Sequence, residues 1–160
     1  MSLSGALHAW AGEQRTIGLG ERENRYAHGA CSFLAQMGMP ERIVAYNLGQ
    51  AAVCIAHTAP ASKQLMDSRL EVNRQETFQR YLSGMRLLWR NEPGWEAPLA
   101  IDYERPAERP ALLFERGVLG RAAESLARDP RWRRVYADRV ATVFVAAQPA
   151  ETAGLGEAGP

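Results

Sequence analysis

The sequence predicts an α/β fold: a mostly parallel, loosely Rossmann-like sheet covered by helices, with a C-terminal antiparallel hairpin. Helical and strand-like stretches alternate along the middle of the chain, a pattern typical of parallel sheets with helical crossovers. The last two strand-like stretches are joined by a short polar link, which is a hairpin signal. A chain of 160 residues with 46% apolar residues is also the size of one ordinary domain.

A single α/β domain is expected over residues 25–147, between two loosely ordered ends. Residues 1–24 mix glycine with charged residues and show no sustained period, so they are interpreted as a lead-in segment. Residues 148–160 are rich in Gly, Pro and Ala and are predicted to be a disordered tail.

The first half of the domain contains two helix-strand pairs. Apolar residues at helical spacing predict helices, and short apolar stretches bounded by turns predict buried strands. In order, the stretches are a helix over 26–39, a strand over 42–47, a small-residue helix over 48–57 and a strand over 63–67.

The second half begins with the clearest helix, which ends before Pro93 and Gly94. Asn73 and Glu76 have the spacing of a capping box at its start. The remaining stretches are mostly connection over 95–110, a strand over 111–114, a helix over 118–126, and hairpin strands over 132–136 and 140–146.

Charge and hydropathy argue against two classes of partner. The formal charge is +1, with 19 basic and 18 acidic residues, so no large net field favours nucleic acid or an anionic membrane. The run Arg131, Arg133 and Arg134 is interpreted as a solvated strand face. The longest apolar runs, 51–56 and 140–147, are far shorter than the roughly 20 residues of a membrane span. The first residues lack the features of a signal peptide.

Motifs for cofactors and metals are mostly missing. Gly18 and Gly20 form a Gly-x-Gly, but Glu23 stands where a dinucleotide site needs its third glycine. The three histidines are scattered and have no metal-type spacing with the two cysteines. We therefore expect no cofactor and no metal.

Cys31 and Cys54 each lie among small apolar residues. Buried free thiols are the favoured interpretation, and a single disulfide is the alternative if the domain lies outside the cytoplasm. His57, at the end of a predicted helix, is interpreted as a capping or surface residue.

A polar cluster follows the second strand, in the stretch "KQLMDSRLEV". Open α/β sheets place ligand crevices at the carboxyl ends of their strands, so this cluster and the Asn after the first strand are candidate ligand-binding residues. They are Asn47, Asp67, Ser68, Arg69 and Glu71. The alternative is structural: the Asp67 side chain holds the turn, and Arg69 pairs with a nearby carboxylate. No catalytic residue is assigned.

The stretches "GLGERENRYAHGACSFLAQMGMPERIVAYNLGQAAVCIA", "KQLMDSRLEVNRQETFQRY" and "DPRWRRVYADRVATVFV" resemble the soluble C-terminal domain of bacterial polytopic membrane proteins. These are glycosyltransferases of the lipid-linked-sugar type, similar to protein mannosyltransferases. The resemblance covers roughly residues 18–146. An Asp-Gly-Arg turn of that family corresponds to Asp67, Ser68 and Arg69, with Ser68 replacing the glycine, and the family's Asn corresponds to Asn47.

The resemblance implies an accessory domain on the outer face of the cytoplasmic membrane, whose partner is a membrane-protein portion or a homologous subunit. The membrane portion that would carry glycosyl transfer is absent from the sequence, so no transferase activity is expected. As a stand-alone protein the chain would be cytoplasmic, because no targeting signal is visible.

Three functions are compatible with the sequence. The favoured one is a non-catalytic accessory or binding domain. The second is a small soluble enzyme that acts on a sugar or phosphosugar near Asn47, Asp67 and Arg69. The third is a protein-interaction module without a ligand. An enzyme would need converging titratable groups, whereas an interaction module would need an exposed apolar patch.

Overall fold

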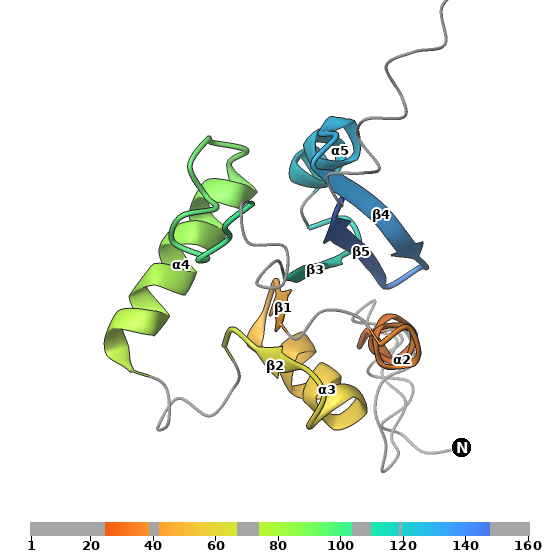
Figure 1. The fold of residues 1–160 in the computed structure, drawn as a ribbon. Coiled ribbons are helices and arrows are strands. Elements are labelled where there is room, and N and C mark those ends of the chain that lie inside the picture. Colours follow the sequence, from red (N-terminus) through yellow and green to blue (C-terminus); the bar gives the residue numbers. More distant parts are fainter. Residues whose placement is uncertain (1–24, 39–41, 67–73, 104–109, 119, 148–160) are drawn as a thin grey trace, which may run out of the picture.

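The fold is seen in a computed structural model, which describes residues 25–38, 42–66, 74–103, 110–118 and 120–147 (Figure 1). Asp67, Ser68, Arg69, Glu71, the lead-in segment and the tail lie outside these residues. The elements are α2 (His28–Gln36), β1 (Arg42–Ala45), α3 (Leu48–Thr58), β2 (Lys63–Gln64), α4 (Gln75–Trp89), β3 (Ala111–Glu115), α5 (Gly120–Arg128), β4 (Trp132–Ala137) and β5 (Ala141–Ala146).

The strands form one open sheet in the order β2-β1-β3-β5-β4. β1 pairs in parallel with both β2 and β3, whereas β5 pairs antiparallel with β3 and with β4. The predicted mixed α/β class, with a parallel part and an antiparallel C-terminal hairpin, is therefore confirmed. In the described part of the chain, none of the helices is both long enough and apolar enough to cross a membrane.

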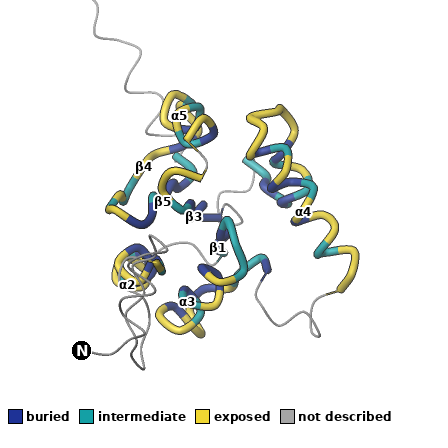
Figure 2. Tube along the Cα trace, turned by 180° about the vertical axis from the view of Figure 1, so that it is seen from behind, coloured by how far each residue is buried: buried dark blue, intermediate teal, exposed yellow. Residues whose placement is uncertain are grey.

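Alternation of side chains along the central strands produces two cores, one on each face of the sheet. Val44, Leu112 and Phe114 point to one face, where they pack with residues of α4 and α5. Ile43 and Leu113 point to the other face, where they pack with residues of α2 and α3. Both faces are covered (Figures 1 and 2), which explains why these strands read as continuous apolar runs.

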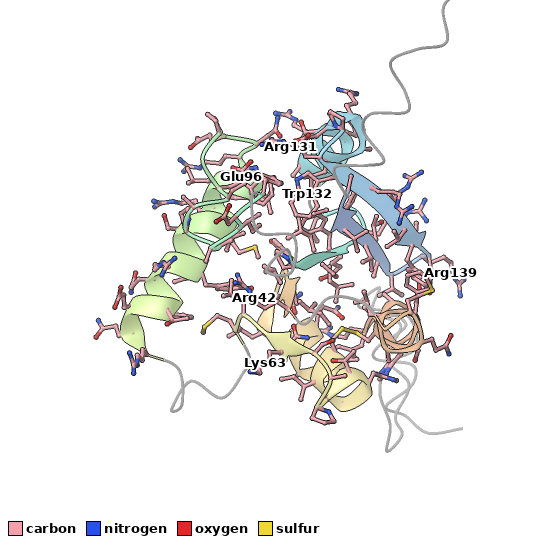
Figure 3. All side chains as sticks on the ribbon, viewed as in Figure 1. Arg42, Lys63, Glu96, Arg131, Trp132 and Arg139 are labelled. Atoms are coloured by element: carbon pink, nitrogen blue, oxygen red, sulfur yellow. A yellow bond between two sulfur atoms is a disulfide. The ribbon has the colours of Figure 1, made fainter. Side chains whose placement is uncertain are left out.

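The cysteines depart from the favoured expectation of free thiols. Cys31 in α2 and Cys54 in α3 form a disulfide, with their Cα atoms 4.9 Å apart. Figure 3 shows this bond between the two helices. Both residues were correctly expected to be buried. Their sequence neighbourhoods did not reveal that α2 and α3 pack side by side, and that packing brings the two sulfur atoms together.

The predicted capping box at the start of α4 is also wrong. The helix begins at Gln75, and its N-cap residue is Arg74, which makes no side-chain capping hydrogen bond. Glu76 lies in the first helical turn, where a carboxylate still interacts favourably with the helix dipole. Asn73 lies outside the described residues.

The segment after α4 is more than a connection. Trp95, Leu99 and Ile101 are buried in the core beside α4 and α5. Gly84 lets Leu99 lie against α4, because a Cβ atom there would overlap the Leu99 side chain. Arg42 Nη2 donates to the Leu99 carbonyl at 2.7 Å, which ties this segment to the start of β1.

β2 and β4 are the edge strands of the sheet. β2 spans only Lys63–Gln64, shorter than the strand predicted over 63–67. The hairpin forms as predicted, and Asp138 organises its turn by accepting hydrogen bonds from the backbone N–H groups of Val140 and Ala141, both at 2.7 Å. Arg133 and Arg134 are exposed on β4 while Trp132 is buried, which confirms the solvated-face interpretation for these two residues, whereas Arg131 lies before the strand.

Candidate functional site

The carboxyl ends of β1 and β3 meet where the strand order reverses. The chain runs from β1 outward to β2 and then returns past β1 to form β3. In open α/β sheets, ligands bind outside the carboxyl ends of the strands at such a reversal. Two polar residues of this protein lie at this place: Asn47, two residues after β1, and Glu115, the last residue of β3.

Asn47 and Glu115 are hydrogen-bonded across the reversal point. Asn47 Nδ2 donates to Glu115 Oε2 at 3.1 Å, and Asn47 Oδ1 accepts from the backbone N–H of Gln50 at 2.8 Å. The second contact makes Asn47 the N-cap of α3. The Glu115 carboxylate thus lies beside a helix N-terminus, where the dipole favours negative charge. Both residues are half-buried.

Tyr81 fixes the backbone that carries Asn47. From α4, its hydroxyl donates towards the carbonyl oxygens of Ala45 and Tyr46, at 2.9 and 2.8 Å. Burial, assisted by Tyr46, raises the pKa of Tyr81 well above its ordinary value. The hydroxyl is therefore protonated at neutral pH and acts as a donor.

Gln50 holds the other side of the α3 N-terminus. Its side chain is buried, its Oε1 accepts from the Ala27 backbone N–H at 2.8 Å, and its Nε2 donates to the Arg25 carbonyl at 3.1 Å. These bonds connect the start of α2 to the first turn of α3. The chain on either side of Asn47 is therefore held from α4 on one face of the sheet and from the start of α2 on the other.

One of the five predicted site residues lies within the described residues. Asn47 occupies the predicted strand edge, as the rule for parallel strands requires. Asp67, Ser68, Arg69 and Glu71 lie outside the described residues, so their role stays a prediction. Glu115 was not predicted as a site residue. Its signal in the sequence is that it directly follows the buried run "ALLF".

A second polar cluster joins the segment after α4 to β4. Arg131 donates from Nε and Nη2 to the Asp129 carboxylate, and its guanidinium stacks over the Tyr103 ring at 4.5 Å. Trp132 Nε1 donates to the Tyr103 hydroxyl at 2.8 Å. Figure 3 shows Arg131, Trp132 and Glu96 gathered here.

Titration in this cluster follows from the same contacts. Burial raises the pKa of Tyr103 to about 12. For Asp129, burial acts to raise the pKa, but the hydrogen bonds and charge of Arg131 outweigh it and hold the pKa below its ordinary value. All these groups satisfy one another, so we assign the cluster to stability.

A third cluster lies on the outer side of α2 and α3. His28 Nδ1 is 2.9 Å from His57 Nε2, and His57 Nδ1 is 3.1 Å from Ser32 Oγ. The surface position predicted for His57 is confirmed. Its pairing with His28 was not predicted, because the two residues are 29 positions apart.

Comparisons with known proteins do not identify a family for this chain. No protein-family model matches the sequence, and neither the curated proteins nor the solved structures compared contain a match. The resemblance to glycosyltransferase-like accessory domains therefore stays a prediction. The Asn47–Glu115 pair is judged on its chemistry: an amide that donates and accepts, next to a carboxylate that accepts.

Proposed function

We propose that this protein is a non-catalytic α/β binding domain, loosely Rossmann-like, that takes its ligand at the strand edge formed by Asn47 and Glu115. Its broader role would be that of an accessory domain related to membrane glycosyltransferase-like proteins. The hydrogen bond between these two side chains carries the proposal, because it lies where open α/β sheets bind ligands.

The chemistry of the pair favours a neutral, hydroxyl-rich ligand. A carboxylate accepts hydrogen bonds from hydroxyl groups, and an amide can donate to a hydroxyl or accept from it. A helix N-terminus alone would also suit phosphate, but the Glu115 carboxylate beside α3 opposes a second negative charge there. An uncharged sugar therefore fits this edge better than a phosphosugar.

The anchoring of the pair supports binding to a prepared surface. Asn47 is fixed by the Gln50 N–H, and the backbone before it is fixed by Tyr81. Side chains that are already ordered lose little conformational entropy when a ligand arrives. A hydroxyl ligand would replace one hydrogen bond, the one between Asn47 and Glu115, with bonds to itself.

The disulfide supports the extracytoplasmic location that the resemblance implies. Structural disulfides form and persist mainly in oxidising compartments, and the Cys31–Cys54 bond joins two helices of the core. In this proposal the domain lies at the outer face of the cytoplasmic membrane, and its partner is a membrane-protein portion or a homologous subunit.

A sugar-directed enzyme is the second candidate, and the Glu115 carboxylate is the observation in its favour. A carboxylate at a strand edge can serve as a general base when a substrate hydroxyl is within hydrogen-bond reach. Asn47 would then orient the substrate. The two candidates differ in turnover but not in the location of the ligand.

Ligand titration followed by NMR tests the proposal. Neutral mono- and disaccharides, sugar phosphates, nucleotide sugars and polyprenyl-phosphate analogues are added separately to the whole chain. We expect saturable shifts of the Asn47, Gln50 and Glu115 amide signals with a neutral sugar. Glu115→Gln and Asn47→Ser should abolish these shifts, and Ser is chosen because it still caps the helix.

The control is Arg133→Ala, at an exposed position on β4, which should bind like the wild type. Asp67→Ala and Arg69→Ala show whether the predicted cluster takes part. Shifts that survive in both Glu115→Gln and Asn47→Ser, or no shifts with any of these compounds, would overturn the proposal. Chemical conversion of a bound sugar would establish the enzyme instead.

A further inference from the structure

The imidazoles of His28 and His57 converge on the surface of α2 and α3. We propose that they form a binding site for a divalent transition-metal ion, with Cu²⁺ preferred. His28 Nδ1 and His57 Nε2 are the two protein ligands, and water completes the coordination. The site is separate from the strand edge at Asn47 and independent of the function proposed there.

The disulfide between α2 and α3 helps to bring the imidazoles of His28 and His57 together. His28 lies three residues before Cys31, and His57 lies three residues after Cys54, so each histidine is on the same helix face as its cysteine, one turn away. The disulfide holds the Cα atoms of the cysteines 4.9 Å apart. The histidines therefore meet on the exposed side of the helix pair, with ring centroids 5.2 Å apart.

The spacing of the two nitrogen atoms suits cis ligands of one ion. They are 2.9 Å apart, and with metal–nitrogen bonds of about 2.0–2.1 Å that spacing corresponds to an angle of about 90° at the metal. Tetragonal Cu²⁺ and Ni²⁺ use such angles, whereas tetrahedral Zn²⁺ needs nitrogens farther apart. Copper also has the highest affinity among the divalent first-row ions.

Ser32 provides the outer contact that metal-binding histidines usually make. When His57 Nδ1 donates its hydrogen to Ser32 Oγ, 3.1 Å away, the Nε2 lone pair faces His28. Metal-binding histidines commonly donate their second N–H in this way, which fixes the tautomer. Without metal, one hydrogen lies between the two facing nitrogens. With metal, that hydrogen passes through solvent to the other nitrogen of His28, and the ion lies to one side of the line between the two facing nitrogens, about 2.0–2.1 Å from each.

The helix ends contribute no net attraction. His57 lies in the last turn of α3, whose carbonyl end favours a cation, while His28 begins α2, whose amide end opposes one. Affinity must therefore come from the imidazoles themselves. The described residues include no cluster of three or more His, Cys, Asp and Glu placed for a metal, so the proposed site has two protein ligands.

Copper titration of the whole, oxidised chain tests the inference. Cu²⁺, Ni²⁺ and Zn²⁺ salts are each titrated by calorimetry, and Cu²⁺ is also followed by electron paramagnetic resonance. We expect one Cu²⁺ per chain with hyperfine splitting from two nitrogens, and weaker binding of Ni²⁺ and Zn²⁺. Binding should fall as the pH is lowered, because protonated imidazoles cannot be ligands.

Variants separate this site from adventitious binding. Ser32→Ala should weaken Cu²⁺ binding about tenfold, and His28→Gln and His57→Gln should each weaken it more. Both glutamines replace exposed side chains, and circular dichroism verifies that the variants fold. The control is His8→Ala, which should bind like the wild type. Equal affinity in the double variant His28→Gln/His57→Gln, or equal losses in His8→Ala and His57→Gln, would refute the site.

Discussion

Asn47 Nδ2 and Glu115 Oε2 lie 3.1 Å apart, although 68 residues separate them in the chain. The contact joins the start of α3 to the last residue of β3. It exists because β1 and β3 are parallel neighbours, so their carboxyl ends lie at the same edge of the sheet.

A second carboxylate at this contact should destabilise the protein in a way that a further substitution repairs. Asn47→Asp keeps a capping oxygen for Gln50 but places a carboxylate opposite Glu115. We expect a loss of about 1 kcal/mol in the free energy of unfolding by urea. Glu115→Gln in the Asn47→Asp background should restore most of it. Additive effects of the two substitutions would show that the side chains are not coupled.

Removing the Tyr81 hydroxyl should loosen the same edge. Tyr81→Phe takes away the donor to the Ala45 and Tyr46 carbonyl oxygens. The expected cost is about 1–2 kcal/mol in unfolding free energy. Amide hydrogen exchange should accelerate at Gln50, whose N–H is held by Asn47. Unchanged exchange at Gln50 would mean that Tyr81 stabilises the core without positioning Asn47.

The disulfide should make a large contribution to stability. Cys31 and Cys54 are 23 residues apart, and a loop of this size corresponds to about 3 kcal/mol by the loop-entropy relation. We therefore expect Cys31→Ala/Cys54→Ala to lower the unfolding free energy by about that amount. A reducing agent should destabilise the wild type and leave the double variant unaffected. An equal loss of stability in both proteins on reduction would contradict the presence of the Cys31–Cys54 disulfide.

Asp138 should make stability depend on pH in the acid range. Burial acts to raise its pKa, but hydrogen bonds from Ala141, Tyr136 and Val140 outweigh it and hold the pKa below the ordinary Asp value. The native state therefore binds this proton less readily than the unfolded chain. The stabilisation is complete above the unfolded value of about 4 and is lost as the pH falls through the lower folded value.

Urea unfolding of the wild type and Asp138→Asn between pH 2 and 7 measures this contribution. At pH 7 the variant should be less stable by about 2 kcal/mol, because two backbone donors lose a charged acceptor. The difference should shrink below pH 4. A difference that stays constant over this range would show that the Asp138 charge does not hold the turn.

Several elements were predictable because they depend on neighbouring residues. The helices at α2, α3, α4 and α5 follow the 3.6-residue period, and Pro or Gly near their ends marks where they stop. The hairpin was predictable because its two strands are adjacent in the sequence. The capping box was a wrong prediction. Asn73 and Glu76 have the right spacing, but the helix begins one residue later than a capping box at these positions requires, with Arg74 as its N-cap.

Long-range contacts were harder to predict from the sequence. The rule that parallel strands share a carboxyl edge was enough to select Asn47, but selecting Glu115 required knowing that β3 is the neighbour of β1. The burial of Trp95 and Leu99 could not be read from their surroundings, because the 95–103 segment has no regular period. Gly84 in the preceding helix leaves room for Leu99, and Arg42, far away in the sequence, donates to the Leu99 carbonyl.

Local pattern alone established the α/β class, the positions of the helices and the exposed face of β4, because each reflects burial that repeats over a few residues. Tertiary packing decided the strand order, the Cys31–Cys54 bond, the meeting of His28 with His57 and the Asn47–Glu115 contact. Each of these joins residues that are distant in the chain, and their proximity depends on how the helices and strands pack. Asn47 was therefore found as one residue at a strand edge, and the fold made it half of a pair.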